Sequence, residues 1–575
     1  MFKSARITLI IFVAISILPV SSAVAASRNS ADLLKYVPAD TPYVFASLRP
    51  MPDKLADKIE PTVDQVLRAY QRIIRYSVSE KLAEVSSDDG GAAEAQRVEA
   101  LVDEVLDLMS VEGIRNAGVQ RGSAFAFYGN GLLPVLRFEL SDTKLFDEAI
   151  ARIEDKAGAQ LSIGTVGGKS YKYVEHDAIR LVIATLDEQA VLTVVPTEFD
   201  ESQLAVALGL DKPRKNLAKS RELRSIAKKY GFSDYFTGFI NNERIASAFL
   251  GSPTGLNRDL LESLDYDDSE LSEVCQSEFM EIAGIAPRIV FGYSTLNETH
   301  IDSGFVVELR SDIAEGLARL PAVVPGLGQD YSGLMSFGFS LNPLAARQFY
   351  EARLDALEAD PFDCELLADM QVGVAAGREA LSKPVPPVVY GFRGILAVVD
   401  DIQGMDMASQ KPPESMDASF LLAIENAQNL VAMAALLDAQ IAALNLLPDG
   451  KPVKLEMAEL ATIADEAFVA LSEGALAVSV GKGAEGKAGQ MLVTKSADPA
   501  PLMSMSLDAA RYYGFIGEAM MQMEPDEGEE DMPMEVQSAL QEAMTLIGSL
   551  YKRMRVDVRL TGRGIEMDSR LILAD

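Results

Sequence analysis

Short runs that alternate apolar and polar residues recur along this chain, and each passes into a segment with helical periodicity. Alternation with a period of two predicts a β-strand with one buried face, and apolar residues spaced three or four apart predict an amphipathic helix. A residue that can cap a helix, such as Asp or Asn, stands between the two. The clearest copies of this strand, cap and helix unit begin at Tyr43, Pro134, Tyr235, Phe305, Leu334, Ser419 and Leu502.

Turn signals between these units predict antiparallel pairing. Asn130-Gly131 lies between two apolar runs and is typical of a tight hairpin turn. Residues 170–195 predict a three-strand meander, and residues 288–309 and 554–573 predict hairpins. The spacing of the units is irregular, so no solenoid of fixed period is expected. The pattern predicts a multi-domain α+β fold, with antiparallel sheets, helices packed on one face and repeated strand-cap-helix units.

The chain has 575 residues, which is enough for several domains. Composition shifts at a basic interlude, residues 208–225, and at a proline-containing break, residues 409–417. We therefore expect three α+β domains after the amino-terminal segment, covering residues 26–210, 211–410 and 411–575.

The amino-terminal segment carries the pattern of an export signal. Lys3 and Arg6 precede an apolar run from Ile7 to Val20, and small residues follow at 23–25. This order predicts a cleavable signal peptide over residues 1–25, with an amino-terminal membrane anchor as the alternative. No cysteine stands directly after the cleavage site, so no lipoprotein anchor is expected, and no later apolar run is long enough to cross a bilayer. We expect a periplasmic or secreted protein with no transmembrane segment after cleavage.

The sequence LLKYVPADTPYVFASL, Leu33 to Leu48, resembles the opening of a group of uncharacterised exported bacterial proteins of unknown function. The resemblance covers about thirty residues and the general layout. It implies export and an α+β build, and it implies no functional residues.

Charge and composition exclude several classes of function. A net charge of -33 disfavours nucleic acid and anionic membrane surfaces as main partners, because both require a basic footprint. The two histidines, His176 and His300, each lie in a predicted turn and are too few for most histidine-dependent sites. The two cysteines, Cys275 and Cys364, are even in number and predict a disulfide in an oxidising compartment.

Three local sequence motifs are candidates for a catalytic or ligand-binding site. Gly481 to Ala488, GKGAEGKA, approaches a phosphate-binding loop but lacks the hydroxyl residue, and the residues after it favour a returning strand. Ser141 and Lys144 have the spacing of a Ser/Lys nucleophile pair, although Ser141 is better interpreted as a helix cap. The acidic residues of 265–270 lack the spacing of a calcium-binding loop.

A methionine-rich stretch flanks an acidic run near the carboxyl terminus. Thioether pairs suit Cu(I), so the stretch is a candidate copper site; the alternative is a mobile acidic loop whose methionines pack at helix ends. The four candidate ligands are Met521, Met523, Met532 and Met534.

The failure of the catalytic motifs favours a non-catalytic binding or interaction protein of the bacterial cell envelope. The expected partner is an envelope protein or an apolar small molecule held in a groove between sheet and helices. Two alternatives stay open: an envelope hydrolase that uses carboxylates or a Ser/Lys pair, and a methionine-rich copper-binding protein. No motif predicts a cofactor, and the sequence leaves the oligomeric state open.

Overall fold

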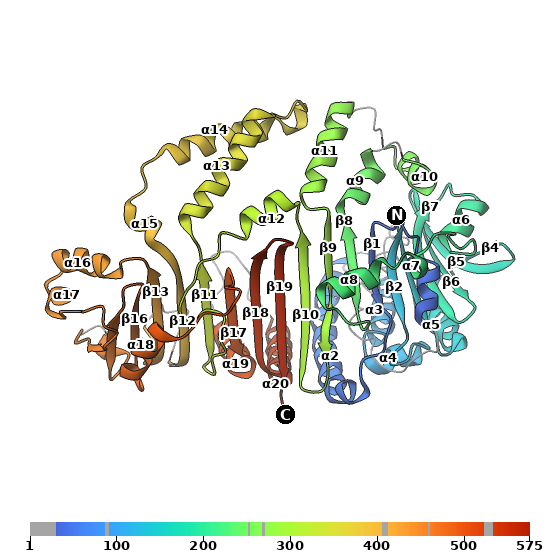
Figure 1. Ribbon diagram of the computed structural model, residues 1–575. Helices are drawn as coiled ribbons and strands as arrows, with labels where there is room; N and C mark the ends of the chain where they lie inside the picture. Colours follow the sequence, from blue (N-terminus) through green and yellow to red (C-terminus); the bar gives the residue numbers. More distant parts are fainter. Residues whose placement is uncertain are drawn as a thin grey trace. The chain divides into compact units, whose positions relative to one another are not determined.

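The computed structural model describes residues 30–86, 91–250, 253–266, 271–404, 412–457, 460–522 and 533–575. The predicted signal peptide, residues 1–25, lies outside them. The described chain combines helices with antiparallel strands, which confirms the α+β class (Figure 1). It divides into two compact units. Unit 1 contains Met1–Gly304 and Met532–Leu550, and unit 2 contains Phe305–Asp531 and Tyr551–Asp575.

The sheet of unit 1 is antiparallel and has the strand order β9-β8-β1-β2-β3-β7-β6-β5-β4. Asn130 pairs with Leu133 across the β2–β3 turn, where Gly131 has a φ of 59° that glycine adopts without strain. The predicted hairpin at this turn and the predicted meander of β5, β6 and β7 are therefore confirmed. The strands are β1 (Tyr43–Ser47), β2 (Phe125–Asn130), β3 (Leu133–Glu139), β4 (Ser162–Val166), β5 (Lys169–His176), β6 (Ile179–Leu186), β7 (Gln189–Pro196), β8 (Thr237–Asn241) and β9 (Arg288–Leu296).

The helices of unit 1 follow from local capping and amphipathic patterning. α5 begins after Asp142, whose carboxylate accepts hydrogen bonds from the amides of Lys144 and Leu145, and it ends at Gly158 in the left-handed conformation. The expectation that Ser141 caps this helix was wrong by one residue. The helices are η2 (Ser30–Lys35), α2 (Asp53–Ser86), α3 (Gly91–Asp107), α4 (Val111–Asn116), α5 (Thr143–Ala157), α6 (Glu201–Ala207), α7 (Leu217–Ser220), α8 (Glu222–Tyr230), α9 (Asn242–Leu250), α10 (Leu256–Ser263), α11 (Glu273–Ile285) and α20 (Met534–Leu550).

The sheet of unit 2 is also antiparallel, with the order β19-β18-β17-β11-β12-β13-β16-β15-β14. The predicted closing hairpin is confirmed as β18 and β19, which pair along their length. The boundary with unit 1 falls within β10 (His300–Glu308). The other strands are β11 (Met335–Ser340), β12 (Phe392–Gln403), β13 (Ser415–Ile424), β14 (Val453–Lys454), β15 (Ala467–Leu471), β16 (Ala475–Val480), β17 (Met503–Asp508), β18 (Tyr551–Thr561) and β19 (Gly564–Leu573).

Helices alternate with these strands along the sequence of unit 2. They are α12 (Ser311–Leu317), α13 (Pro343–Ala359), η4 (Glu365–Leu367), α14 (Ala368–Ser382), α15 (Pro387–Gly391), α16 (Ala427–Leu437), α17 (Ala439–Ala443), η5 (Leu460–Thr462), α18 (Ala484–Val493) and α19 (Ala509–Gln522). α18 packs on one face of the sheet, where its Ala488, Met491 and Leu492 meet Leu396 and Leu421 in a buried cluster. A second cluster in unit 2 joins Ile424, Ala427 and Leu471.

The two sheets place their strands in the same order relative to the sequence. β1 and β11 each have a neighbouring strand on both sides, and the next two strands in sequence extend the sheet on one side. β7 or β16 then pairs with the third strand, while β8 or β17 pairs with the first strand on its other side. Helices α5 and α16 therefore hold equivalent positions, each directly after the third strand.

The predicted disulfide is present. Cys275 and Cys364 are disulfide-bonded, and the described chain has no free cysteine. Both side chains are buried, and Cys275 lies within α11. Among the described residues, no helix combines the length and the apolar character that crossing a bilayer requires.

Candidate ligand-binding cavity

The structure does not bring together most of the motif residues that the sequence singled out. Ser141 donates its hydroxyl proton to the carbonyl of Gly118 at 2.9 Å, so that proton is committed to the backbone. His176 Nε2 lies 3.4 Å from a carboxylate oxygen of Asp177. His300 Nε2 likewise lies 3.7 Å from a carboxylate oxygen of Asp302. These contacts are those of strand ends and turns, and they form no shared site.

The candidate copper ligands are only partly within the described chain. Met523 and Met532 lie outside the described residues, and Met521 lies in α19. Met534 is the first residue of α20 and is 84% exposed. The acidic run between them and most of residues 265–270 also lie outside the described residues. In the part of the chain that is described, no group of three or more His, Cys, Asp or Glu side chains is arranged to hold a metal ion.

The glycine-rich motif leads into a helix, so the expectation of a returning strand after it was wrong. Gly481 and Gly483 have φ values of 85° and 72°, and α18 starts directly after Gly483. Lys487 does not face an open loop, because its Nζ lies 2.7 Å from a carboxylate oxygen of Asp400 and 2.5 Å from one of Asp417. Two carboxylates beside the lysine repel an anion, so this loop lacks the electrostatics of a phosphate site.

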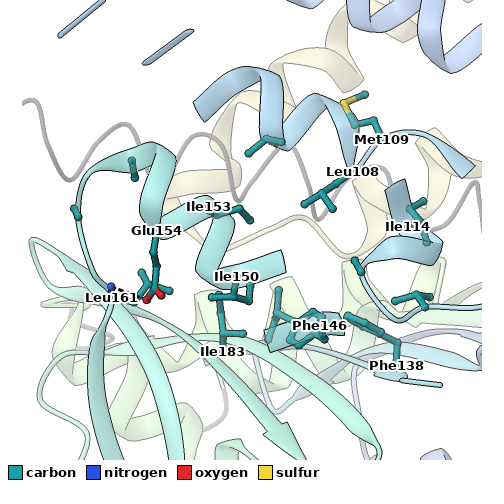
Figure 2. Close-up of a pocket in the computed structure, with 16 residues that line it drawn as sticks. Leu108, Met109, Ile114, Phe138, Phe146, Ile150, Ile153, Glu154, Leu161 and Ile183 are labelled. Carbon is teal, nitrogen blue, oxygen red and sulfur yellow. Dashed lines mark hydrogen bonds between the residues drawn. The ribbon is translucent and has the colours of Figure 1, made fainter. Parts of the chain in front are cut away.

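An apolar cavity lies in unit 1 between α3, α4 and α5 and one face of the sheet (Figure 2). Its volume is about 140 Å³. Glu154 is the one ionisable residue among those that line it. The lining residues are Val105, Leu108, Met109, Ile114, Ala117, Val119, Phe138, Phe146, Ile150, Ile153, Glu154, Ala157, Ala159, Leu161, Ile183 and Leu192.

The sheet wall of the cavity follows from strand register. Phe138 of β3, Ile183 of β6 and Leu192 of β7 all line it. Ile183 and Leu192 are directly paired across β6 and β7, so their side chains lie on the same face of the sheet. Phe138 pairs with Ala190, whose small side chain leaves room beside the phenyl ring. A shift of one residue in this register would turn these side chains to the other face.

The helical wall comes mainly from one stripe of α5. Phe146, Ile150, Ile153 and Ala157 are spaced by three or four residues and therefore share one face of the helix. The Phe138 and Phe146 rings meet edge to face at a centroid distance of 5.9 Å. α3 contributes Val105 to the cavity wall. On the outer surface, Arg152 of α5 forms an ion pair with Glu104 of α3, with Nε and a carboxylate oxygen 2.7 Å apart.

The single carboxylate lies at one end of the cavity lining, away from the Phe138 ring in Figure 2. Glu154 is only 4% exposed. One of its oxygens accepts the amide proton of Leu161 at 3.0 Å, and the other accepts from Lys172 Nζ at 2.6 Å. A buried carboxylate with these two donors is electrostatically satisfied, so the rest of the cavity wall can remain apolar.

The opposite face of β3 carries a buried cation that the sequence did not reveal. Arg137 is 1% exposed, donates to Gln189 Oε1 at 2.8 Å and to the carbonyl of Leu208, and lies 3.8 Å from the centre of the Tyr36 ring. Burial raises the pKa of the neighbouring Tyr128 phenol, and the Arg137 charge acts in the opposite direction. These partners hold Arg137 against the sheet, on the side away from Phe138 and the cavity.

Comparison of this chain with protein-family models, with curated proteins and with solved structures finds no match.

Proposed function

We propose that this chain is a non-catalytic binding protein of the bacterial cell envelope that takes an apolar ligand in the cavity of unit 1. The observation that carries the proposal is the cavity itself, whose lining is apolar except for Glu154. Burial of apolar surface away from water is favourable by roughly 25 cal/mol for each Å². An apolar ligand in this cavity would withdraw its apolar lining from water, and this supplies the driving force for binding.

The size of the cavity defines the part of a ligand that it can hold. An apolar protein cavity of about 150 Å³ stays dry and binds benzene. The unit 1 cavity is close to that volume, so it fits one aromatic ring or a short length of acyl chain. The proposal places this binding in the periplasm or outside the cell, on the strength of the export pattern in residues 1–25 and the disulfide.

Toluene provides a direct test, because it is apolar, neutral and of the right size. At ten times its Kd, toluene stabilises a protein that binds it only when folded by about 1.4 kcal/mol. We expect calorimetry to show a rise in Tm of a few degrees, and native mass spectrometry of the untreated protein to reveal any ligand retained from the cell.

A matched pair of variants on α5 separates cavity binding from general effects. Ala157 lines the cavity, whereas Ala151 lies on the exposed side of the same helix. Ala157→Phe is expected to fill the cavity and remove the toluene effect, while Ala151→Phe leaves it unchanged. Absence of any toluene effect in the unmodified protein, or its survival in Ala157→Phe, would overturn the proposal.

A further inference from the structure

An exposed apolar hairpin, residues 427–448, stands out in unit 2. It comprises α16, α17 and the residues up to Pro448 (orange in Figure 1). Asp438 is its only ionisable residue, although 24% of the chain is charged. Leu436 is 86% exposed and Leu437 is 91% exposed. Soluble surfaces seldom carry several large apolar side chains together without a binding role.

One side of this apolar hairpin is anchored to the unit 2 sheet. Leu430 and Val431 of α16 and Leu446 beyond α17 pack against Ile424, Ala427 and Leu471. α17 is capped by Asp438, whose carboxylate accepts from the Gln440 amide at 2.7 Å. The apolar hairpin is therefore held on the sheet on one side, and the amino-terminal end of α17 is capped from within the hairpin.

The exposed side chains surround the end of the hairpin rather than forming one flat face. Leu436 and Leu437 are consecutive, so they point about 100° apart around the axis of α16. Met433, 56% exposed, lies one turn earlier, and Leu447, 65% exposed, follows α17. A rigid protein groove would have to enclose the tip to cover all four, whereas fluid acyl chains contact a tip from every side.

We propose that the apolar hairpin inserts into the interface of a bilayer of neutral lipids. The segment has no lysine or arginine, and the nearest cation along the sequence, Lys451, is paired with Asp449 at 2.8 Å. With a net charge of -33, the chain gains nothing from anionic headgroups, so burial of apolar side chains supplies the attraction. Asp438 limits the depth, because an ionised carboxylate is costly inside the hydrocarbon region.

The absence of tryptophan from this chain allows a specific reporter. Leu437→Trp places a single indole at the tip of the full-length protein. With phosphatidylcholine vesicles we expect its emission to move to shorter wavelength and to be quenched by lipids with brominated chains. Added phosphatidylglycerol should weaken binding. Unchanged emission, or binding that depends on phosphatidylglycerol, would overturn the proposal.

Vesicle co-sedimentation of further variants assigns the binding to this hairpin. The double variant Leu436→Gln with Leu437→Gln should bind phosphatidylcholine vesicles at least tenfold more weakly. Its control, Leu366→Gln with Val372→Gln, changes two side chains that are 65% and 69% exposed elsewhere in unit 2 and should bind normally. Asp438→Asn retains a helix-capping side chain without the charge, so it should bind more tightly.

Sedimentation velocity without lipid tests the competing occupant, a second copy of this chain. A monomer in both the unmodified protein and the Leu436→Gln, Leu437→Gln variant agrees with a lipid partner. A dimer that this variant dissociates would assign the hairpin to self-association and overturn the proposal. Equal vesicle binding by the variant and its control would also overturn it.

Discussion

α5 of unit 1 and α16 of unit 2 follow equivalent strands, β3 and β13. The apolar stripe of α5 faces the sheet, whereas several large apolar side chains of α16 are exposed. α5 has the sequence TKLFDEAIARIEDKA, in which every charged residue except Glu154 is exposed and an apolar stripe faces the sheet. α16 has the sequence AQNLVAMAALL and carries no charge at all. The same position in the strand order therefore yields an internal cavity in one unit and an external apolar surface in the other. The pattern of side chains, rather than the order of strands, decides which one forms.

The largest difference is expected when an apolar side chain is removed from each helix. Phe146 is 8% exposed, so Phe146→Ala should lower the free energy of unfolding by about 3 to 5 kcal/mol. Leu437 is 91% exposed, so Leu437→Ala should change it by less than about 0.5 kcal/mol. Urea unfolding followed by circular dichroism measures both. Similar losses for the two variants would show that α16 is covered in solution.

A smaller effect is expected at the one carboxylate that borders the cavity. Lys172→Met removes the cation that Glu154 contacts at 2.6 Å and should cost about 1 to 3 kcal/mol, because the buried carboxylate loses a donor. Lys169→Met on the same strand is the control, since Lys169 pairs with Asp187 at 3.7 Å on the exposed surface. Its effect should stay below about 0.5 kcal/mol. Equal unfolding midpoints in urea for the two variants would contradict the role given to Lys172.

The smallest effect is expected at the corresponding single carboxylate of the apolar hairpin. Asp438→Ala removes the acceptor for the Gln440 amide and should cost about 0.5 to 1 kcal/mol, the usual value of a helix cap. Asp438→Asn should restore most of the loss. Hydrogen exchange of the α17 amides measures the change locally, and unchanged protection in Asp438→Ala would show that the cap contributes nothing.

The local sequence pattern was sufficient to predict those elements whose pairing partners are close in sequence. The turn at Gly131 and the long hairpin of β18 and β19 could be predicted, because alternation and turn residues specify them within about twenty residues. The disulfide between Cys275 and Cys364 could be predicted because no other pairing was possible. α18 could not be predicted, since a short apolar run such as AGQMLV fits a strand as well as a helix. Its Lys487 meets Asp400 and Asp417, which lie more than sixty residues away in sequence.

The cavity could not be predicted from the sequence, because it too depends on how segments far apart in the chain come together. A groove between sheet and helices was the expected place for an apolar ligand, but the walls of the cavity come from α3, α4, α5 and three strands. The alternation in β6 and β7 shows that Ile183 and Leu192 belong to some buried face, and only their pairing shows that it is the same face. Whether facing side chains fill the space between a helix and a sheet depends on their combined shapes, which no single segment encodes.

The position of α20 in the sequence determines when unit 1 can be completed during synthesis. It belongs to unit 1, where it packs along α2 and its Glu542 pairs with Arg72, yet it is made after nearly all of unit 2. A chain that emerges from its amino-terminal end therefore presents α2 without its neighbour until residue 550 has appeared. Unit 1 therefore lacks one of its helices until nearly all of unit 2 has been synthesised. A chain that stops at Gly304 would keep the cavity residues and leave one side of α2 bare.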